Sequence, residues 1–511
     1  MKLLTAKQMG ELEQATFQNY KMPSIILMEN AAQGFVQVLS RVCGGVWGKR
    51  AGVYCGKGNN GGDGFAIARH LSNLGAKVTV IIGFEPSVLK KDAKTNFEIM
   101  EQMMVKTIDE KEDSGAYELI VDAVFGTGFH GEISGPEAKM VETINRAHKN
   151  GAFVCAVDMP SGASAENGSM SKICVRADRT ITFGTPKLGQ FLYPAKESVG
   201  TLETVPISIP KRELEEYDSG YFLLDRDILS RLPQREDNTH KGSYGKVLAV
   251  TGSKGMSGAC ILAANAVLKS GAGMVTAAVP KSIADAVAAQ FVEVMTLPLP
   301  TDGEILSKNA VVLLLERLQK QEALLVGCGM GLNENVKHVV GELVTSSRKP
   351  MLIDADGINA LKGNINILKN KKAPAVLTPH PVEFSRITGH SMEYLKEHRI
   401  EAAASFAKEF EVSVVLKGAD SIVAHPNGDV YVSSISNSGM ATAGSGDVLS
   451  GIIAGLLAQG ATAKDAANLG VYFHTLAGNL ARAEKGEYGM TAGDILNAVP
   501  YAMKQALEEM G

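Results

Sequence analysis

The sequence predicts an α/β protein with two domains, each built around a largely parallel sheet. The chain has 511 residues, more than a single domain of about 100 to 200 residues accommodates. Short β-branched runs alternate with helical runs in both halves, and 54 glycines with 45% hydrophobic residues are typical of large α/β units. The alternation fails from about residue 208 to residue 240, where the chain is charged and aperiodic. We therefore expect domains at residues 1–213 and 240–511, joined by a linker at residues 214–239.

The composition excludes several classes of partner. The formal net charge is −4, and the 51 basic residues are scattered, which argues against binding of nucleic acids and other polyanions. The N-terminus turns polar almost at once, and no apolar run reaches the roughly 20 residues of a membrane helix, so no membrane partner is expected. No C-x-x-C pair occurs, and the cysteines are expected to be buried thiols of a cytoplasmic protein. They are Cys43, Cys55, Cys155, Cys174, Cys260 and Cys328.

The first half begins with helices and continues as a βα series. Thr5 followed by Gln8 is typical of a capping box, and Pro23-Ser24 is typical of a second helix start. A further helix is expected at Phe65–Leu74. The strands are expected at Ala51–Cys55, Lys77–Ile82, Leu119–Val124, Phe153–Val157 and Arg179–Phe183. This alternation predicts a doubly wound sheet, in which ligands bind outside the carboxyl ends of the strands.

A glycine-rich loop, Gly56–Gly64, follows the first of these strands. Its small residues allow an anion to approach the backbone, as in phosphate-binding turns. Glycine spacing alone is weak evidence for a dinucleotide site. However, Asn59, Asn60 and Asp63 add donors and acceptors that phosphate binding does not need. We therefore expect this loop to contact a further polar group of the ligand.

Two further strands of the first half end in polar loops. Asp122 precedes the glycine loop Phe125–Glu132, and Asp158 opens the loop Asp158–Gly162. Since parallel strands end at the same edge of a sheet, the three loops are expected to share a pocket. The alternative for each loop taken singly is a turn whose Asp or Asn caps a helix. Asp158 is the candidate for proton transfer, because acid/base catalysis needs a positioned carboxylate.

The same loops carry oxygen ligands for a hard cation. Asn60 and Asp122 suit K⁺, Mg²⁺ or Ca²⁺ rather than zinc, and the sequence contains no zinc-type His/Cys spacing.

Together, the motifs Asn59–Gly64, Val121–Gly128 and Val157–Gly162 closely resemble the NAD(P)HX epimerase family, whose members interconvert the R and S forms of hydrated NAD(P)H. The resemblance implies a Rossmann-like domain in which Asp158 contacts the substrate as an acid/base. It implies a K⁺ ion held by Asn60, Asp122 and Ser161. It also implies that the hydrated dinucleotide is bound by Asn59, Asn60, Gly61, Gly62, Asp63, Gly126, Thr127, Gly128, Phe129, His130, Gly131, Glu132 and Asp158.

The second half contains a run of small residues that leads into an apolar helix. Ser438–Asp447 precedes the helical run Val448–Leu457. Small residues and a helix N-terminus form a phosphate cradle, and Asp447 lies where they meet. A carboxylate beside a bound phosphate is electrostatically unfavourable, which indicates a chemical role for Asp447. The alternative is a capped, tightly packed buried helix.

Polar or glycine-rich loops follow most strands of the second half. The strands are expected at Lys246–Val250, Ala323–Val326, Met351–Ile353, Ala375–Leu377 and Val412–Leu416. This pattern suits a nucleotide and a second large ligand that meet along one sheet edge. Each polar residue also has a simpler interpretation. Lys417 suits a solvated strand-end lysine and His380 a turn histidine, whereas Asp354 and Asp356 equally suit caps of the following short helix.

The segments Gly252–Ala259, Gly327–Gly331, Thr378–Glu383, Lys417–Ser421 and Ser438–Asp447 together resemble the ribokinase-like fold, and more narrowly the ADP/ATP-dependent NAD(P)HX dehydratase family. With the first half attached, the chain is similar to bifunctional NAD(P)H-hydrate repair enzymes. The resemblance implies that ADP or ATP, with Mg²⁺, phosphorylates the hydroxyl group of S-NAD(P)HX. Phosphate then leaves and NAD(P)H is restored. NADHX and NADPHX are the implied substrates, and a homo-oligomer is the implied assembly.

On this resemblance, Asp447 deprotonates the hydroxyl group, and the amides of Gly444–Gly446 stabilise the transferring phosphoryl group. The hydrate is expected to contact Ala259, Gly329, Gly331, His380 and Asp447. The nucleotide is expected to contact Lys417, Gly418, Ala419, Asp420, Ser421 and Gly446. The chain departs from the family pattern at four positions, which bear on the fine positioning of the hydrate: Cys328, Val382, Ser436 and Ala443.

Two other functions fit parts of the sequence. A small-molecule kinase of the ribokinase-like fold would use the Gly444–Asp447 loop to phosphorylate any alcohol, but it leaves the Asn59–Gly64 loop without a role. Alternatively, the first half is a nucleotide-sensing module that binds its ligand without turnover. The sequence leaves ADP and ATP, NADHX and NADPHX, and the identity of the monovalent ion as open alternatives.

Overall fold

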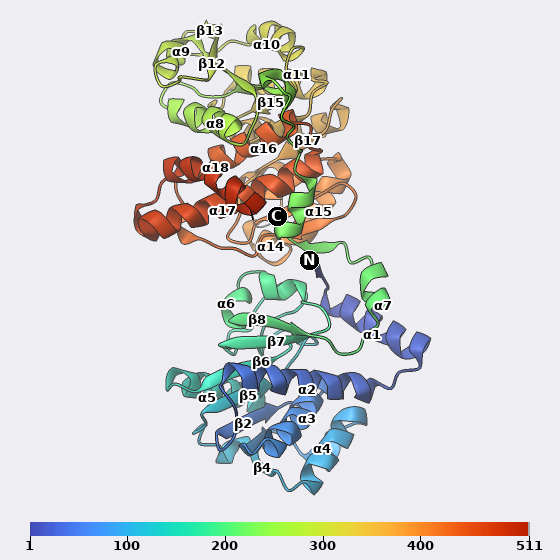
Figure 1. The fold of residues 1–511 in the computed structure, drawn as a ribbon. Coiled ribbons are helices and arrows are strands. Elements are labelled where there is room, and N and C mark those ends of the chain that lie inside the picture. The colour runs from blue at the N-terminus through green and yellow to red at the C-terminus, as the bar shows by residue number, and fades with distance from the viewer. Residues whose placement is uncertain (509–511) are drawn as a thin grey trace. The chain divides into compact units, whose positions relative to one another are not determined.

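The computed structural model describes residues 1–508, which form two compact units (Figure 1). One unit comprises Lys2–Tyr221, and the other comprises Met1 together with the chain from Phe222 onward. The passage between them, after Tyr221, lies in the charged and aperiodic stretch. Two short strands lie near the unit boundaries in the sequence, β1 (Lys2–Leu3) and β9 (Tyr221–Leu223). Across residues 1–508, no helix combines the length and the apolar character needed to cross a bilayer.

The N-terminal unit is built on a sheet in the order β4-β3-β2-β5-β6-β7-β8. Every neighbouring pair in it is parallel. Its strands are β2 (Arg50–Cys55), β3 (Lys77–Ile82), β4 (Lys106–Asp109), β5 (Leu119–Ala123), β6 (Phe153–Val157), β7 (Arg179–Phe183) and β8 (Thr201–Val205). The strand order reverses between β2 and β5, which confirms the predicted doubly wound sheet. Ligands bind at such a switch point, outside the carboxyl ends of the strands.

Helices cover both faces of this sheet, so its strands read as continuous apolar runs. One face packs against α1 (Ala6–Tyr20), α2 (Ser24–Val42), α3 (Asn59–Asn73) and α4 (Lys91–Gln102), and the other packs against α5 (Gly135–Lys149). Two short helices follow, α6 (Lys196–Val199) and α7 (Lys211–Glu216). The Thr5–Gln8 capping box and the helix start after Pro23 are confirmed.

Helix α3 begins earlier than the sequence pattern predicts. The helix expected at Phe65–Leu74 starts at Asn59, so the second part of the predicted loop, Asn59–Gly64, is helical. The glycines that suggest a loop serve close packing instead. A Cβ on Gly61 would collide with the carbonyl oxygen of Gly56, and one on Gly62 would lie 2.9 Å from the Met28 methyl group. Tertiary packing therefore overrides the low helix propensity of glycine. The unpaired backbone N–H groups of the first helical turn can donate hydrogen bonds to an anion at this sheet edge.

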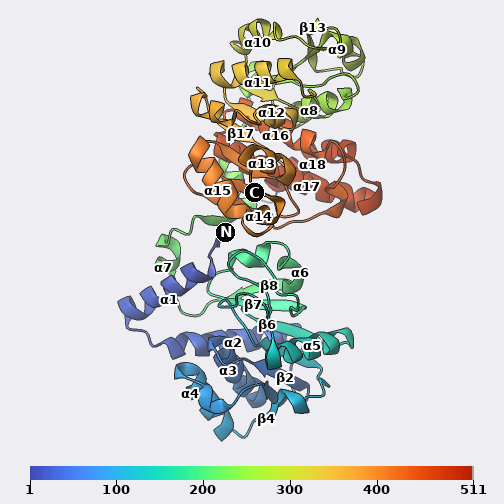
Figure 2. The same cartoon turned by 180° about the vertical axis from the view of Figure 1, so that it is seen from behind.

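The C-terminal unit contains a larger, mixed sheet, seen from behind in Figure 2. From β12 to β18 the order is β12-β11-β10-β15-β16-β17-β18 with parallel pairs, and β19 and β20 extend it antiparallel. Its strands are β10 (Lys246–Val250), β11 (Met274–Pro280), β12 (Met295–Leu299), β15 (Ala323–Val326), β16 (Met351–Ile353), β17 (Ala375–Leu377), β18 (Ser413–Leu416), β19 (Ile422–Ala424) and β20 (Val430–Val432). A hairpin adds β13 (Thr301–Asp302) and β14 (Ile305–Leu306).

The apolar helix α16 (Ser445–Ala458) lies in the core of this unit, between the sheet and other helices. Its Gly451 permits close contact with α8, because a Cβ there would lie 2.5 Å from that of Ala266. The other helices of this unit are α8 (Ser257–Lys269), α9 (Lys281–Ala288), α10 (Ala310–Leu318), α11 (Glu334–Ser346), α12 (Asp356–Ala360), α13 (Pro381–Thr388), α14 (Met392–Glu397), α15 (Arg399–Phe410), α17 (Ala463–Gly489) and α18 (Ala492–Glu508). A helix that is apolar all round is a buried one, so packing holds the start of α16 in place.

Candidate active sites

The polar ends of β5 and β6 meet in the N-terminal unit. Asp122, near the end of β5, is fully buried. Its Oδ2 accepts a 2.7 Å hydrogen bond from the Ser161 backbone N–H, and its Oδ1 accepts a 2.5 Å bond from Ser161 Oγ. Ser161 Oγ accepts a 2.8 Å bond from the N–H of Phe125. These contacts fix the loops after both strands at one edge of the sheet.

Asp122 has no cationic side chain as a partner within residues 1–508. Burial raises its pKa to about 6, although hydrogen bonds from Ser161 and Val124 oppose the shift. Asn60 lies close by, since a Cβ on Gly126 would be 2.7 Å from Asn60 Oδ1. The buried Nδ2 of Asn60 has no hydrogen-bond partner. Asn60, Asp122 and Ser161 thus offer only hard oxygen ligands around a buried, uncompensated carboxylate, and this donor set fits a hard cation.

Asp158 follows β6 with a left-handed backbone, φ 65°, and its side chain is 14% exposed. Its Oδ1 accepts hydrogen bonds from Lys187 Nζ at 2.6 Å, Thr182 Oγ1 at 2.7 Å and the Phe183 N–H at 3.2 Å. Gln190 holds the backbone carbonyl of Asp158 at 2.7 Å. Positive φ is uncommon for residues other than glycine and clusters at functional sites. The strand end, a buried lysine and the backbone therefore fix the orientation of this carboxylate.

Two half-buried carboxyl groups, Asp63 and Glu13, interact electrostatically with Asp158 and Lys187. Burial, followed by the charges of Asp158 and Glu13, raises the pKa of Asp63 well above its usual range. Burial also raises the pKa of Glu13, and Lys187 opposes this shift. The pocket therefore places two carboxyl groups of raised pKa, Asp63 and Glu13, near Asp158, whose Oδ1 is paired with Lys187.

The loop from Gly126 to Glu132 divides into structural and accessible residues. Phe129 is 7% exposed within the core, and its N–H bonds to the Gly126 carbonyl at 3.2 Å, so its ring is not available to a ligand. The Glu132 carboxylate accepts bonds from Ser171 Oγ at 3.0 Å and the Lys172 N–H at 2.9 Å, which fixes the loop. Thr127 is half-buried. Five residues of the predicted contact set are exposed: Asn59, Gly128, His130, Gly131 and Glu132.

In the C-terminal unit, Asp447 lies in the first turn of α16. The N-cap of this helix is Gly444 in the left-handed conformation, φ 89°, and no side chain caps it. Asp447 therefore does not cap the helix, and the capped-helix interpretation of this residue is wrong. Burial, reinforced by the charge of Asp354, raises the pKa of Asp447 to about 7. A carboxylate with this pKa can accept a proton at neutral pH.

A buried ion pair adjoins this turn. Lys417 Nζ lies 3.0 Å from Asp354 Oδ1 and 3.9 Å from Glu383 Oε2, and Ser450 Oγ donates a 2.8 Å bond to Asp354 Oδ2. Lys417 is 22% exposed, so the solvated-lysine interpretation is wrong. A Cβ on Gly446 would lie 3.4 Å from Lys417 Nζ and 4.0 Å from Asp354 Oδ2. The ammonium group thus borders the glycine turn, where it favours an anion.

His474, on α17, contacts Ser445 in the first turn of α16. Its Nε2 lies 3.0 Å from the Ser445 carbonyl oxygen and 3.3 Å from Ser445 Oγ. Burial lowers the pKa of His474 to about 4, so the ring is neutral at physiological pH and its Nε2–H donates to the carbonyl. A neutral, buried imidazole therefore fixes the first residue of α16.

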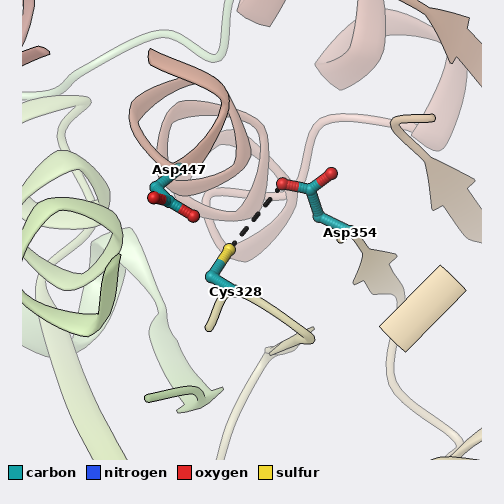
Figure 3. Close-up of side chains that lie close together, drawn as sticks. All are labelled: Cys328, Asp354 and Asp447. Atoms are coloured by element: carbon teal, nitrogen blue, oxygen red, sulfur yellow. Dashed lines mark hydrogen bonds between the residues drawn. The ribbon is translucent and has the colours of Figure 1, made fainter. Parts of the chain in front are cut away.

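Cys328 adds a thiol to the acidic side of the site. It lies in the turn after β15, is 0% exposed, and its Sγ is 3.8 Å from Asp354 Oδ2. Figure 3 shows Cys328, Asp354 and Asp447 around a common space. One potential ligand atom from each of the three lies within 4.8 Å of the others.

The residues predicted to line the hydrate lie on neighbouring turns. A Cβ on Gly329 would lie 2.8 Å from that of Ala259, and Ser253 Oγ donates a 2.8 Å bond to the Gly329 carbonyl. Asp356 accepts a 2.8 Å bond from the Gly331 N–H. The N-cap of α12 has no side-chain hydrogen bond, so neither Asp354 nor Asp356 caps that helix.

His380 is the N-cap of α13, where its Nδ1 accepts from the N–H groups of Val382 and Glu383, both at 3.2 Å. The Glu383 carboxylate accepts a 2.8 Å bond from the His380 N–H and so completes a capping box. The His380 side chain is 45% exposed, and burial together with nearby Lys417 lowers its pKa. Its Nε2 lies 3.3 Å from Glu383.

The segment after β18 is only partly available to a nucleotide. The Asp420 carboxylate is buried against Arg399, with Oδ1 2.6 Å from Nη1, and the Asp420 carbonyl accepts a 3.1 Å bond from Nη2. Asp420 therefore shapes this turn rather than presenting its charge. Gly418 and Ala419 are exposed, and Ser421 Oγ bonds to the Gly418 carbonyl at 3.2 Å.

 Several residues that hold these sites carry no local sequence signal. The separation in sequence between such a residue and a hydrogen-bond or ion-pair partner is 21 residues for Arg399 and Asp420 and 96 residues for Ser450 and Asp354. Only the fold brings such partners together. The supporting residues that the sequence motifs do not reveal are Glu13, Lys187, Glu383, Arg399, Ser450 and His474.

Comparison with known proteins agrees with this two-part architecture. Residues 24–189 match the family described as YjeF-related protein N-terminus, and residues 247–501 match the family described as NAD(P)H-hydrate dehydratase. A ribokinase-like superfamily protein from Enterococcus faecalis is 27% identical, with a TM-score of 0.50, and the match covers 57% of this chain and 98% of that protein. The ribokinase-like fold predicted for the second half is thereby confirmed.

Two α/β units, one with a doubly wound sheet and one ribokinase-like, define the class of this protein. A bifunctional NAD(P)H-hydrate repair enzyme from Moorella thermoacetica is 42% identical over 522 residues, covering 100% of this chain and 98% of its own. The chain belongs to the family of bifunctional NAD(P)H-hydrate repair enzymes. An ADP/ATP-dependent NAD(P)H-hydrate dehydratase from Bacillus subtilis, co-crystallised with ATP and Mg²⁺, is 26% identical with a TM-score of 0.49 over 56% of this chain and 98% of its own.

Proposed function

We propose that this chain repairs hydrated NAD(P)H in two steps. Residues 1–213 epimerise R- and S-NAD(P)HX, and residues 240–511 dehydrate the S form with consumption of a nucleotide, while residues 214–239 join the two domains. Membership of the repair-enzyme family supports both activities. The observation that carries the dehydratase assignment is Asp447, a half-buried carboxylate with a pKa of about 7 in the first turn of α16.

In the dehydratase step, Asp447 accepts the proton of the hydrate's hydroxyl group. The hydroxyl oxygen then attacks the terminal phosphorus of the nucleotide, and AMP leaves if the nucleotide is ADP. The N–H groups of Gly444–Gly446 and the nearby ammonium of Lys417 favour the charge on the transferring group. Cleavage of the new C–O–P ester at its C–O bond expels phosphate, and loss of a proton from the adjacent carbon restores NAD(P)H. Phosphate is a far better leaving group than hydroxide.

The nucleotide is proposed to bind along the turn after β18 and the start of α16. Lys417, Gly418, Ala419, Ser421 and Gly446 supply its contacts, whereas the charge of Asp420 is engaged by Arg399. Mg²⁺ typically binds through substrate phosphates and one or two carboxylates. Asp354 fits that role by its hard oxygens and its position beside Gly446. When bound, Mg²⁺ would neutralise phosphate charge.

The hydrate is proposed to occupy the turns that carry Ala259, Gly329, Gly331 and His380. Its hydroxyl group would then point toward Asp447. The His380 side chain is 45% exposed, and its Nδ1 is committed to the helix cap, so we assign the polar contact with the hydrate to Nε2, which also lies 3.3 Å from Glu383.

In the epimerase step, Asp158 acts as the acid/base. Its Oδ1 is held by three donors, whereas no hydrogen bond is recorded to its Oδ2 within residues 1–508. The hydrated dinucleotide is proposed to contact the first turn of α3, from Asn59 to Asp63, and the loop from Gly126 to Glu132, where Phe129 acts only through packing. Asn60, Asp122 and Ser161 would hold K⁺, which would offset the buried charge of Asp122.

The remaining proposals concern substrates, assembly and compartment. NADHX and NADPHX are both proposed as substrates, and the chain is proposed to form a homo-oligomer by its family resemblance. All six cysteines are unpaired, which supports a reducing compartment such as the cytoplasm.

The direct test of the dehydratase proposal uses purified S-NADHX with Mg²⁺ and either ADP or ATP. Absorbance of the reduced nicotinamide reports NADH, and chromatography reports AMP or ADP. We expect stoichiometric NADH, nucleotide product and phosphate with one of the two nucleotides. Nucleotide consumption on other alcohols without NADH formation would instead identify a small-molecule kinase.

A further inference from the structure

Cys328, Asp354 and Asp447 bring one sulfur and two carboxylates to a common space from three separate elements (Figure 3). Cys328 lies in the turn after β15, Asp354 follows β16, and Asp447 lies in the first turn of α16. We propose that this trio, termed the thiol–carboxylate site, binds a thiophilic divalent cation such as Zn²⁺, and that the bound cation blocks the dehydratase unit.

The spacing of the ligand atoms suits a small cation. All three lie within 4.8 Å of one another, and Cys328 Sγ is 3.8 Å from Asp354 Oδ2. A tetrahedral zinc ion with bonds of about 2.3 Å to sulfur and about 2.0 Å to oxygen separates the two ligand atoms by about 3.5 Å. Cys328 Sγ and Asp354 Oδ2 are therefore within a few tenths of an ångström of this separation, and three ligands leave a fourth position open for water or substrate.

The two carboxylates of the trio attract a cation, and the Lys417 ammonium engages only one oxygen of Asp354. Asp354 uses Oδ1 for Lys417, whereas Oδ2 faces Cys328 and Ser450. Thr378 beside Asp354 is 0% exposed, and its Oγ1 has no hydrogen-bond partner of good geometry. This buried hydroxyl can form a hydrogen bond with a water molecule on a bound metal ion.

The sulfur determines which cation binds. Mg²⁺ prefers oxygen ligands, whereas a thiolate selects softer ions such as Zn²⁺. Binding replaces the thiol proton of Cys328, which is released to solvent, by the metal–sulfur bond. A cation held by Asp447 prevents that carboxylate from accepting the substrate proton. The inhibitory consequence therefore rests on the proposed function, whereas metal binding itself does not.

Binding is tested on the full-length protein, freed of metal with a chelator and titrated with Co²⁺ as a spectroscopic substitute for Zn²⁺. We expect a sulfur-to-cobalt charge-transfer band that Zn²⁺ abolishes. Cys328→Ser should remove the band, and Asp447→Asn should weaken cobalt binding at least tenfold. Cys260→Ala is the matched control, because Cys260 is also fully buried in this unit but lies outside the trio. No band in the wild type, or an unchanged band in Cys328→Ser, would overturn the proposal.

Inhibition is tested with S-NADHX, nucleotide and excess Mg²⁺ at controlled free Zn²⁺. Each variant is normalised to its own zinc-free rate. We expect chelator-reversible inhibition of the wild type and of Cys260→Ala, and at least a tenfold weaker effect of zinc on Cys328→Ser. Equal zinc sensitivity of Cys328→Ser and the wild type would overturn the inhibitory role. If no NADH forms even without zinc, the proposed function fails, and the cobalt spectrum still decides whether the metal site exists.

Discussion

Lys187 Nζ lies 2.6 Å from Asp158 Oδ1, and the lysine side chain is 0% exposed. The same ammonium group also donates to Thr182 Oγ1 at 3.0 Å and to the Phe183 carbonyl at 2.8 Å. All three N–H donors of the lysine are therefore used. A fully bonded, buried cation beside the proposed acid/base group fixes that group in place.

Replacement of Lys187 by Met should remove this support. The change leaves Asp158 as a partly buried charge without its partner, and breaking such a pair costs about 3–5 kcal/mol. We expect a lower midpoint of thermal unfolding and a loss of epimerase activity. Lys172→Met, which changes an exposed lysine of the same unit, is the control. Unaltered stability and epimerisation in Lys187→Met would show that the pair has neither role.

The rate of the dehydratase step should depend on pH through Asp447. The ionised carboxylate is the active form, and its pKa is raised to about 7, so activity is lost as pH falls through that value. We expect kcat/KM for S-NADHX to rise about tenfold per pH unit below this pKa and to level off above it. Asp447→Asn should lower the rate by a factor of about 10² to 10⁴ at every pH. A flat profile from about pH 5 to 8 in the wild type would exclude a base with this pKa.

His474→Ala should weaken nucleotide handling without removing the chemistry. The substitution leaves the Ser445 carbonyl without its buried donor, which costs about 1–3 kcal/mol. We expect a rise in KM for the nucleotide and a rate loss of roughly tenfold. Because the pKa of His474 is about 4, the pH dependence above pH 6 should match that of the wild type. His338→Ala, on α11 of the same unit, is the control. A shifted pH profile in His474→Ala would indicate a direct proton-transfer role instead.

Asp122→Asn should uncouple the epimerase from K⁺. The amide has nearly the shape of the carboxylate but lacks the charge that would attract the cation. We expect the wild-type rate to increase when K⁺ replaces choline at constant ionic strength, and the variant to show little response. Glu132→Gln is the control, since its carboxylate is exposed and bonded to Ser171 and Lys172. A K⁺ response of wild-type size in Asp122→Asn would contradict the assigned ligand set.

The strand pattern of this chain is readable from sequence because buried parallel strands are short, continuous apolar runs. All five expected strands of the N-terminal sheet and all five expected in the second half match the structure to within one residue at each end. The start of α3 is not readable in this way. Its glycines have low helix propensity, and only packing against Gly56 and Met28 explains them.

The sites are partly readable from sequence. Glycine turns and strand-end carboxylates mark where ligands meet the sheet edge. They identify Asp122, Asp354 and Asp447 as candidate site residues. The residues that hold the sites in place, such as Lys187 beside Asp158 and His474 beside Ser445, lie elsewhere in the sequence, in segments without a chemical motif. The functional state of a carboxylate depends on such partners and on burial, so it follows only from the three-dimensional structure.

The most direct measurement of the two-step repair uses an equilibrium mixture of R- and S-NADHX with Mg²⁺, K⁺ and the preferred nucleotide, and follows NADH formation to completion. We expect the wild type to convert both epimers, Asp158→Asn to slow sharply once the S share is consumed, and Asp447→Asn to form NADH at least about a hundredfold more slowly than the wild type. An equal mixture of the two variants should restore full conversion. A wild type that stops at the S share, or an Asp158→Asn protein that continues at the wild-type rate, would contradict the account.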